Sequence, residues 1–155
     1  MPDPDVNAMF DMAAKLDYFR MPLESGLKVA KTGKKTFTYD DGAGKTSKAD
    51  FNYSQIVIAQ QLLDRFEWIG QSERAYISLE RTAQFDKLGV NDSLAEIEAL
   101  WLNKQLAAPL QFIPLLTKIA SHESYMHLVR DRAARLKDAF QAPVTAAKAG
   151  DSSSK

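Results

Sequence analysis

Apolar residues recur at helical spacing over most of the chain. Residues 6–21 place them on one side of a helix, which Pro22 is expected to end. Two further helices are predicted over residues 54–69 and 72–88, because Gly70 stands where a left-handed C-cap would end the first and Ser72 could cap the second. We expect these two helices to form an antiparallel hairpin.

The second half of the chain contains further helix boundaries. Ser93 is followed three residues later by Glu96, which predicts a capping box at a helix start. Pro109 and Pro114 interrupt an apolar stretch, so we expect a break just before Pro109 and a helix start or kink near Pro114. A last amphipathic helix is predicted over residues 124–140.

Residues 26–48 interrupt the helical pattern. This stretch is rich in Lys, Thr and Gly, and it contains the alternating run TFTY at 36–39 followed by DDGAG at 40–44. The pattern predicts a small β-hairpin or a mobile loop. Because an isolated two-stranded hairpin is marginally stable in water, we expect it to pack on the helices or to stay flexible.

Taken together, the pattern predicts an all-α fold: a five- or six-helix bundle with a small β-hairpin or flexible loop inserted after the first helix. Residues 1–140 are expected to form a single helical domain, within which residues 28–49 are the hairpin or mobile basic loop. Residues 141–155, rich in Ala, Gly and Ser, are expected to form a disordered tail. With 45% hydrophobic residues, the chain has enough apolar material for a core.

Charge and composition exclude several classes of function. Lys plus Arg and Asp plus Glu number 20 each, so no overall field steers the chain toward polyanions or acidic membranes. No run approaches the ~18 apolar residues of a membrane span, and the N-terminus lacks the features of a secretory signal. The absence of cysteine excludes disulfides and thiol nucleophiles. We expect a soluble, cytoplasmic protein.

Residues 39–46 resemble the end of a phosphate-binding loop, G-x-x-x-x-G-K-[ST], except that Tyr39 occupies the first glycine position. Asp40 and Asp41 would repel a phosphate inside such a loop. Nothing around the segment suggests the buried parallel strand that precedes a loop of this kind. We therefore expect a hairpin turn or a flexible loop rather than a nucleotide site.

The two histidines of the chain, His122 and His127, lie close together in the sequence. Their spacing differs from that of a zinc-binding H-E-x-x-H helix, because residues five apart are separated by about 140° around the helix axis. We therefore predict no metal and no cofactor, and interpret the segment as a solvated helix start. An enzyme is our third functional hypothesis, and it would need His122 or His127 in a pocket.

The predicted helices carry more apolar positions than one stripe can hold. Such helices either lie centrally in a bundle or use the second apolar face to bind a partner or an identical subunit. We favour a non-catalytic protein–protein interaction module, an adaptor or small subunit of a larger complex. Its partner-binding residues are predicted to include Trp68, Tyr76 and Trp101.

The alternative is a nucleic-acid-associated helical protein. Residues 28–49 carry six lysines against two aspartates and include aromatic residues, as surfaces for single-stranded nucleic acid do. The predicted helix over 124–140 adds arginines on its outer face. The residues expected to contact backbone phosphates are Lys31, Lys34, Lys35, Lys45, Arg130, Arg132 and Arg135.

Overall fold

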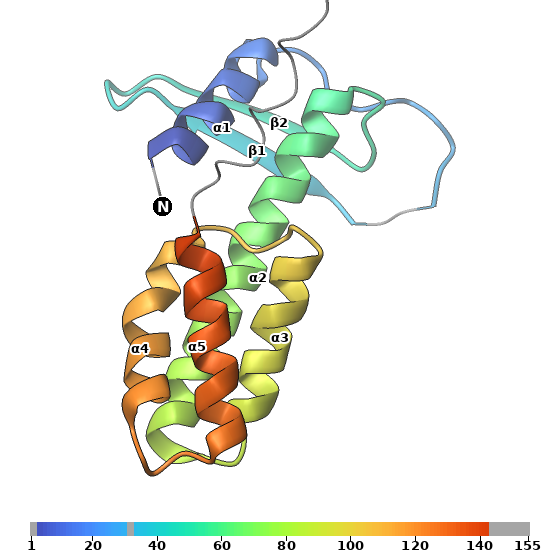
Figure 1. Cartoon of the computed structure of the whole chain (residues 1–155). Helices are drawn as coiled ribbons and strands as arrows, with labels where there is room; N and C mark the ends of the chain where they lie inside the picture. Colours follow the sequence, from blue (N-terminus) through green and yellow to red (C-terminus); the bar gives the residue numbers. More distant parts are fainter. Residues whose placement is uncertain (1–2, 31–32, 143–155) are drawn as a thin grey trace, which may run out of the picture. The chain divides into compact units, whose positions relative to one another are not determined.

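A computed structural model of the chain describes residues 3–30 and 33–142. This part of the chain forms five α-helices, two 3-10 helices and two strands, which are shown in Figure 1. In chain order they are α1 (Asp3–Lys15), η1 (Asp17–Phe19), β1 (Lys35–Asp40), β2 (Thr46–Phe51), α2 (Val57–Phe85), α3 (Val90–Leu102), η2 (Pro109–Phe112), α4 (Ile113–Ser121) and α5 (His127–Gln141).

The chain divides into two compact units within α2, one ending at Gly70 and the other beginning at Gln71. We call the first the hairpin unit, because it contains the two strands together with α1, η1 and the start of α2. We call the second the helical unit, because it contains the rest of α2 with α3, η2, α4 and α5. Each unit has a hydrophobic core of its own.

The all-α prediction is wrong, because β1 and β2 pair as an antiparallel sheet that carries part of a core. Phe37, Ala49 and Phe51 are buried on the inner face of this sheet. The ring of Phe37 lies 5.1 Å from those of both Phe19 and Phe51, centroid to centroid. The hairpin therefore does not stand alone, and contacts with the helical elements of its unit supply the stability that two strands lack.

One continuous helix replaces the two that were predicted around Gly70. Since α2 runs from Val57 to Phe85, the predicted antiparallel helical hairpin is wrong. Gly70 is not among the described glycines with the positive φ that a left-handed C-cap requires. Ser72 is buried, and its Oγ accepts a hydrogen bond from the Ala107 N–H at 2.8 Å, so it does not act as a helix cap.

Two other helix ends differ from the prediction. The first helix ends at Lys15 rather than at Met21, because the next residues turn into the left-handed region, with Tyr18 at a φ of 49°. α3 begins at Val90, without a side-chain cap. Ser93 lies inside that helix, where its Oγ is 3.2 Å from the Thr82 Oγ1, so the predicted capping box is wrong.

Other predicted boundaries are confirmed. Pro109 opens η2 directly after Ala108, which has a φ of 47°, and Pro114 lies in the first turn of α4. The helix predicted over residues 124–140 is also present as α5, although it begins later than predicted, at His127, and it buries one face formed by Val129, Ala133, Leu136 and Phe140.

The predicted single domain over residues 1–140 stays a prediction. Of the predicted disordered tail, residues 143–155 lie outside the described residues. None of the helices in residues 3–30 and 33–142 has the combination of length and apolarity needed to cross a membrane.

Candidate interaction groove

In the turn between β1 and β2, the side chains of Asp40 and Asp41 accept hydrogen bonds from backbone N–H groups of the turn. The Asp40 Oδ1 accepts a hydrogen bond from the Gly42 N–H at 2.8 Å. The Asp41 Oδ1 accepts two more, from the N–H groups of Ala43 at 2.8 Å and Lys45 at 3.0 Å. A phosphate-binding loop would aim such N–H groups at its ligand. Here these N–H groups are already hydrogen-bonded to the two aspartate carboxylates, and the segment is a hairpin turn.

The two histidines each contact a nearby residue on an exposed surface. The His122 Nδ1 lies 2.7 Å from the Ser124 Oγ, and the His127 Nδ1 lies 2.8 Å from the Asp131 Oδ2. In the part of the chain that the structure describes, no three His, Asp or Glu residues are grouped so that they could hold a metal ion.

Two of the three predicted aromatic anchors support one core. Tyr76 and Trp101 are half-buried in the helical unit, where the Tyr76 ring lies 5.4 Å from Phe112 and the Trp101 ring 4.9 Å from Phe140. The rings of Phe112 and Phe140 are 6.2 Å apart, so the four form one aromatic row. Trp68 is half-buried too, but it belongs to the hairpin unit.

Asp50 on β2 holds two of the basic residues near the sheet. Its Oδ2 lies 2.8 Å from the Lys34 Nζ, and its Oδ1 lies 3.6 Å from the Lys48 Nζ. The same Oδ1 accepts a hydrogen bond from the Thr36 hydroxyl at 2.7 Å. The hydrogen bond from Lys34, followed by that from Thr36, lowers the pKa of Asp50 to about 2.

The other lysines of the predicted phosphate-binding set are arranged differently. The Lys35 Nζ donates to the backbone carbonyl of Asn52 at 2.9 Å. Lys45 is exposed at the hairpin turn, and Lys31 lies outside the described residues. The described lysines of this set, Lys34, Lys35 and Lys45, therefore do not form one free basic surface.

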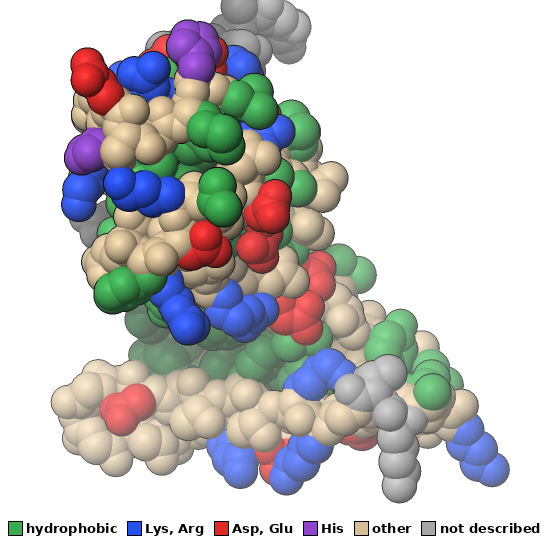
Figure 2. All heavy atoms as spheres, turned by 90° about the horizontal axis from the view of Figure 1, so that it is seen from below, with side chains coloured by type: hydrophobic (Ala, Val, Ile, Leu, Met, Phe, Trp, Pro, Cys, Tyr) green, Lys and Arg blue, Asp and Glu red, His purple; other side chains and the backbone are tan. Residues whose placement is uncertain are grey.

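The three arginines of that set lie on α5 in the helical unit. Arg132 is joined to α3, because its Nη1 donates to the Asn91 Oδ1 at 2.8 Å and its Nε lies 3.3 Å from the Glu98 Oε2. Arg130 is half-buried and Arg135 is exposed. On the face shown in Figure 2, basic and acidic side chains are intermixed over the helices rather than separated by sign.

Two apolar hollows lie along β1 in the hairpin unit. The first, of about 330 Å³, lies among α1, β1 and α2, and its wall includes Met9, Phe10 and Phe66. The second, of about 400 Å³, lies between β1 and α2. Both are lined by Phe19, Thr38 and Phe66. Since they share these residues, we treat them as one continuous surface and call it the β1 groove.

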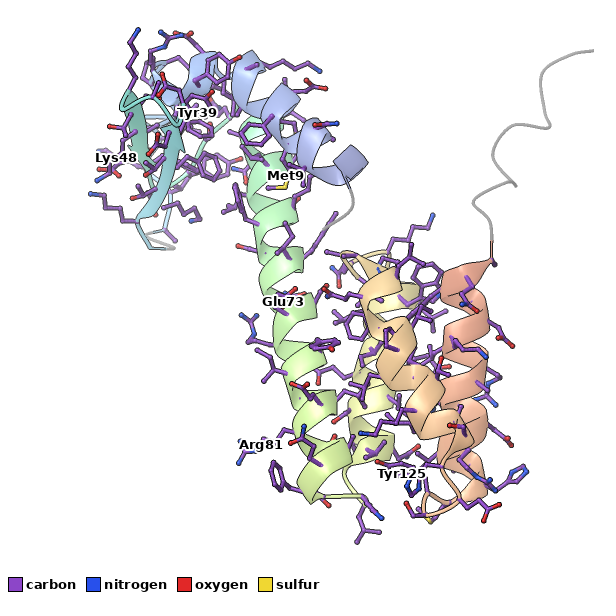
Figure 3. The ribbon with its side chains drawn as sticks, turned by 90° about the vertical axis from the view of Figure 1, so that its left-hand side faces the viewer. Met9, Tyr39, Lys48, Glu73, Arg81 and Tyr125 are labelled. Carbon is purple, nitrogen blue, oxygen red and sulfur yellow. The ribbon has the colours of Figure 1, made fainter. Side chains whose placement is uncertain are left out.

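Exposed aromatic side chains form the rim of the β1 groove. Phe10 is 54% exposed and Phe66 is 49% exposed. The Phe10 ring meets Tyr39 edge-on with centroids 6.5 Å apart, and the Phe66 ring lies 6.0 Å from that of Phe37. In Figure 3, Met9 lies where α1 approaches α2, and Tyr39 lies on the α1 side of the hairpin.

Comparisons with models of known protein families, with curated proteins and with solved structures find no match for this chain.

Sequence reasoning did not find the β1 groove. Phe66 stands at helical spacing with the other apolar residues of the helix predicted over 54–69, so a buried position was expected, whereas Phe10 was not assigned to the apolar side of the helix predicted over 6–21. The alternating run around Phe37 was the one sequence feature that pointed toward the groove, because alternation predicts a strand with one apolar face. It did not indicate which helices would flank that strand.

Proposed function

We propose that the protein is a non-catalytic protein–protein interaction module, an adaptor or small subunit of a larger complex, which holds its partner in the β1 groove. The observation that carries this proposal is the pair of half-exposed rings, Phe10 and Phe66, at the rim of an apolar hollow. Large aromatic residues in such positions are typical anchors of protein interfaces, because a partner removes their remaining apolar surface from water.

The chemistry of the groove favours a binding role. Among the residues that line it, those with ionisable side chains are Lys35, Tyr39 and Asp40. The Lys35 Nζ is hydrogen-bonded to backbone carbonyls, and the Asp40 Oδ1 accepts the Gly42 N–H. General acid–base catalysis needs a titrating group free to reach the substrate. Apolar side chains of a partner are a better match for this lining.

The aromatic residues Trp68, Tyr76 and Trp101 stay predicted contact points of a partner. Tyr76 and Trp101 contribute rings to a core, so a partner would contact only the part of each ring that remains exposed. The nucleic-acid alternative also stays a prediction. It is less favoured because Lys34 and Arg132 already have partners within the chain.

Site-specific photocrosslinking in the cells that produce the protein tests the proposal. A benzoylphenylalanine is placed at Phe66 in one version of the full chain and at Ile77 in a control version. Ile77 is also apolar and exposed on α2, but it lies in the helical unit. We expect a defined protein adduct from position 66 that position 77 does not give.

The adduct should also disappear when Phe10→Asp is added to the version labelled at Phe66, because a charge at the rim opposes apolar docking. Equal labelling from both positions, or no protein adduct from position 66, would contradict the proposal. An adduct that contains nucleic acid would instead favour the alternative.

A further inference from the structure

One edge of the hairpin carries backbone groups that no other described segment pairs with. The Asp41 N–H donates to the Lys45 carbonyl at 3.1 Å, so this pair is a hydrogen-bonded one. Bonded and non-bonded pairs alternate along an antiparallel ladder. With Thr36 opposite Asp50 and Thr38 opposite Lys48, the N–H and C=O groups of both threonines point away from β2.

The same alternation applies to Asp40, which stands opposite Thr46. Among the described residues, no other segment forms a backbone hydrogen bond with Thr36, Thr38 or Asp40. A row of alternating donors and acceptors therefore runs along the outer edge of β1. Such a row is a template for a further strand.

The β1 groove follows this edge. Its two hollows together are lined by all six residues of β1. The side chain of Thr38 lies on the opposite face of the sheet from those of Phe37 and Tyr39. Residues from both faces can line one groove only if the groove runs past the strand edge, where the backbone itself is accessible.

The opposite edge of the hairpin is protected. On β2, the residues whose backbone groups point outward include Lys48 and Asp50, which form an ion pair at 3.6 Å. Beyond the end of β2, the Glu24 carboxylate accepts the Asn52 N–H at 2.6 Å. Charged side chains on an edge strand discourage the addition of another strand. Figure 3 shows Lys48 on the far side of the hairpin from α2.

We propose that the β1 groove binds an extended peptide segment of a partner protein, which adds to the outer edge of β1 as a third strand. This inference rests on the proposed function and identifies the conformation and chemistry of what is bound. A bound helix would already have satisfied its own backbone groups, so it would leave those of Thr36 and Thr38 unpaired. An extended segment can form hydrogen bonds with these backbone groups and, at the same time, place apolar side chains against the lining of the groove.

The geometry also sets the sequence pattern of the segment. Side chains on alternate positions of an added strand point to one face, about 6.8 Å apart. Two apolar side chains at positions i and i+2 would therefore enter the two hollows, one beside Phe37 and Phe66 and the other beside Phe10 and Tyr39. The residue between them would face solvent on the side of Thr38, where a polar side chain is suited.

The test begins with a phage-displayed library of random peptides slightly longer than β1, selected on the immobilised full chain. Selection is repeated on the Phe66→Asp variant, whose fold is verified by circular dichroism, to discard peptides that bind elsewhere. One enriched peptide is then synthesised with a single N-methyl group at each backbone nitrogen in turn. The wild-type protein is used for this scan, so it does not depend on a variant that folds poorly.

We expect the affinity to fall about tenfold or more for N-methylation at every second position and to change little at the positions between. We also expect peptide binding to slow the exchange of the amide protons of Thr36, Thr38 and Asp40 with solvent by at least about tenfold. The amides of Phe37 and Tyr39 should change less, because they are already paired with β2.

A peptide that needs Phe66 but shows no alternation, or gives no protection at Thr36 and Thr38, would overturn strand addition and leave the proposed function standing. Failure to enrich any peptide that depends on Phe66 would also overturn the inference. The proposed function fails separately, through the absence of a protein adduct from position 66 in the crosslinking experiment.

Discussion

The ring of Phe66 on α2 lies 6.0 Å from the ring of Phe37 on β1, centroid to centroid. The two rings differ sharply in environment, since Phe37 is 5% exposed and Phe66 is 49% exposed. Phe37 therefore belongs to the core of the hairpin unit, whereas Phe66 lies beside Phe37 and lines the β1 groove.

Alanine substitutions at these two positions should separate stability from binding. Phe37→Ala is expected to destabilise the protein by about 3–5 kcal/mol, because it leaves a cavity beside Phe19 and Phe51. Phe66→Ala should cost only about 1 kcal/mol, because half of its surface is already in water. Urea unfolding measures both changes. A loss at Phe66 as large as that at Phe37 would show that Phe66 is a core residue and not a rim residue.

The hairpin turn depends on the backbone conformation of Gly44, which has a φ of 91°. An added Cβ at this position would have no heavy atom within 4 Å, so Gly44→Ala tests conformational strain without a steric clash. We expect a loss of about 1–2 kcal/mol in the free energy of unfolding. Gly44→Asn should lose less, because Asn adopts positive φ more readily. Equal effects of Ala and Asn would argue against a strained backbone as the cause.

The lowered pKa of Asp50 predicts a specific dependence of stability on pH. Its pKa falls from the reference value of 3.8 to about 2, chiefly through the hydrogen bond from Lys34. Because the folded-state pKa is depressed, the stabilisation is fully present above the unfolded-state pKa and is lost as the pH falls through 3.8 toward about 2.

Asp50→Asn should remove this dependence. The difference in unfolding free energy between the wild type and the variant is expected to be constant above pH about 5 and to shrink toward pH about 2. Asp64→Asn, at an exposed position of α2, controls for the removal of one carboxylate. Acid titrations at several urea concentrations give the comparison. A difference that stays constant down to pH about 2 would contradict the role assigned to Lys34.

The local pattern predicted elements best where one face of the element is buried along its whole length. α5 is the example, because Val129, Ala133, Leu136 and Phe140 recur at helical spacing and all face one core. The run at 36–39 also alternates, and the strand that contains it buries Phe37 and exposes both of its threonine neighbours. In these segments the spacing of the apolar side chains directly indicates which face of the element is buried.

Helix ends were predicted less well, because a cap contributes only about 1 kcal/mol and tertiary contacts readily outweigh it. Ser72 and Ser93 had the right local context for caps, but their hydroxyls lie inside the helical unit, next to Ala107 and Thr82 respectively. The β1 groove was beyond local prediction for a related reason. Its walls come from four elements, α1, η1, β1 and α2, and only their packing brings Phe66 to the edge of β1.

Arg132 offers a test of whether the basic residues of α5 serve structure or ligand binding. Its Nη1 donates to both the carbonyl and the side-chain oxygen of Asn91, at 3.3 and 2.8 Å, and these contacts join α5 to α3. Arg132→Met should therefore lower the free energy of unfolding by about 1–3 kcal/mol, because it leaves polar groups of Asn91 without their donor.

Arg135→Met is the matched control, since Arg135 lies on the same helix and is exposed. It should change stability by less than about 0.5 kcal/mol. Urea unfolding of both variants, beside a mobility-shift assay with single-stranded DNA at low salt, separates the two roles. If Arg132 and Arg135 serve phosphate binding instead, both variants should weaken the shift to a similar extent while leaving the unfolding curve unchanged. The contacts to Asn91 predict the opposite for Arg132: a less stable helical unit with no change in any shift.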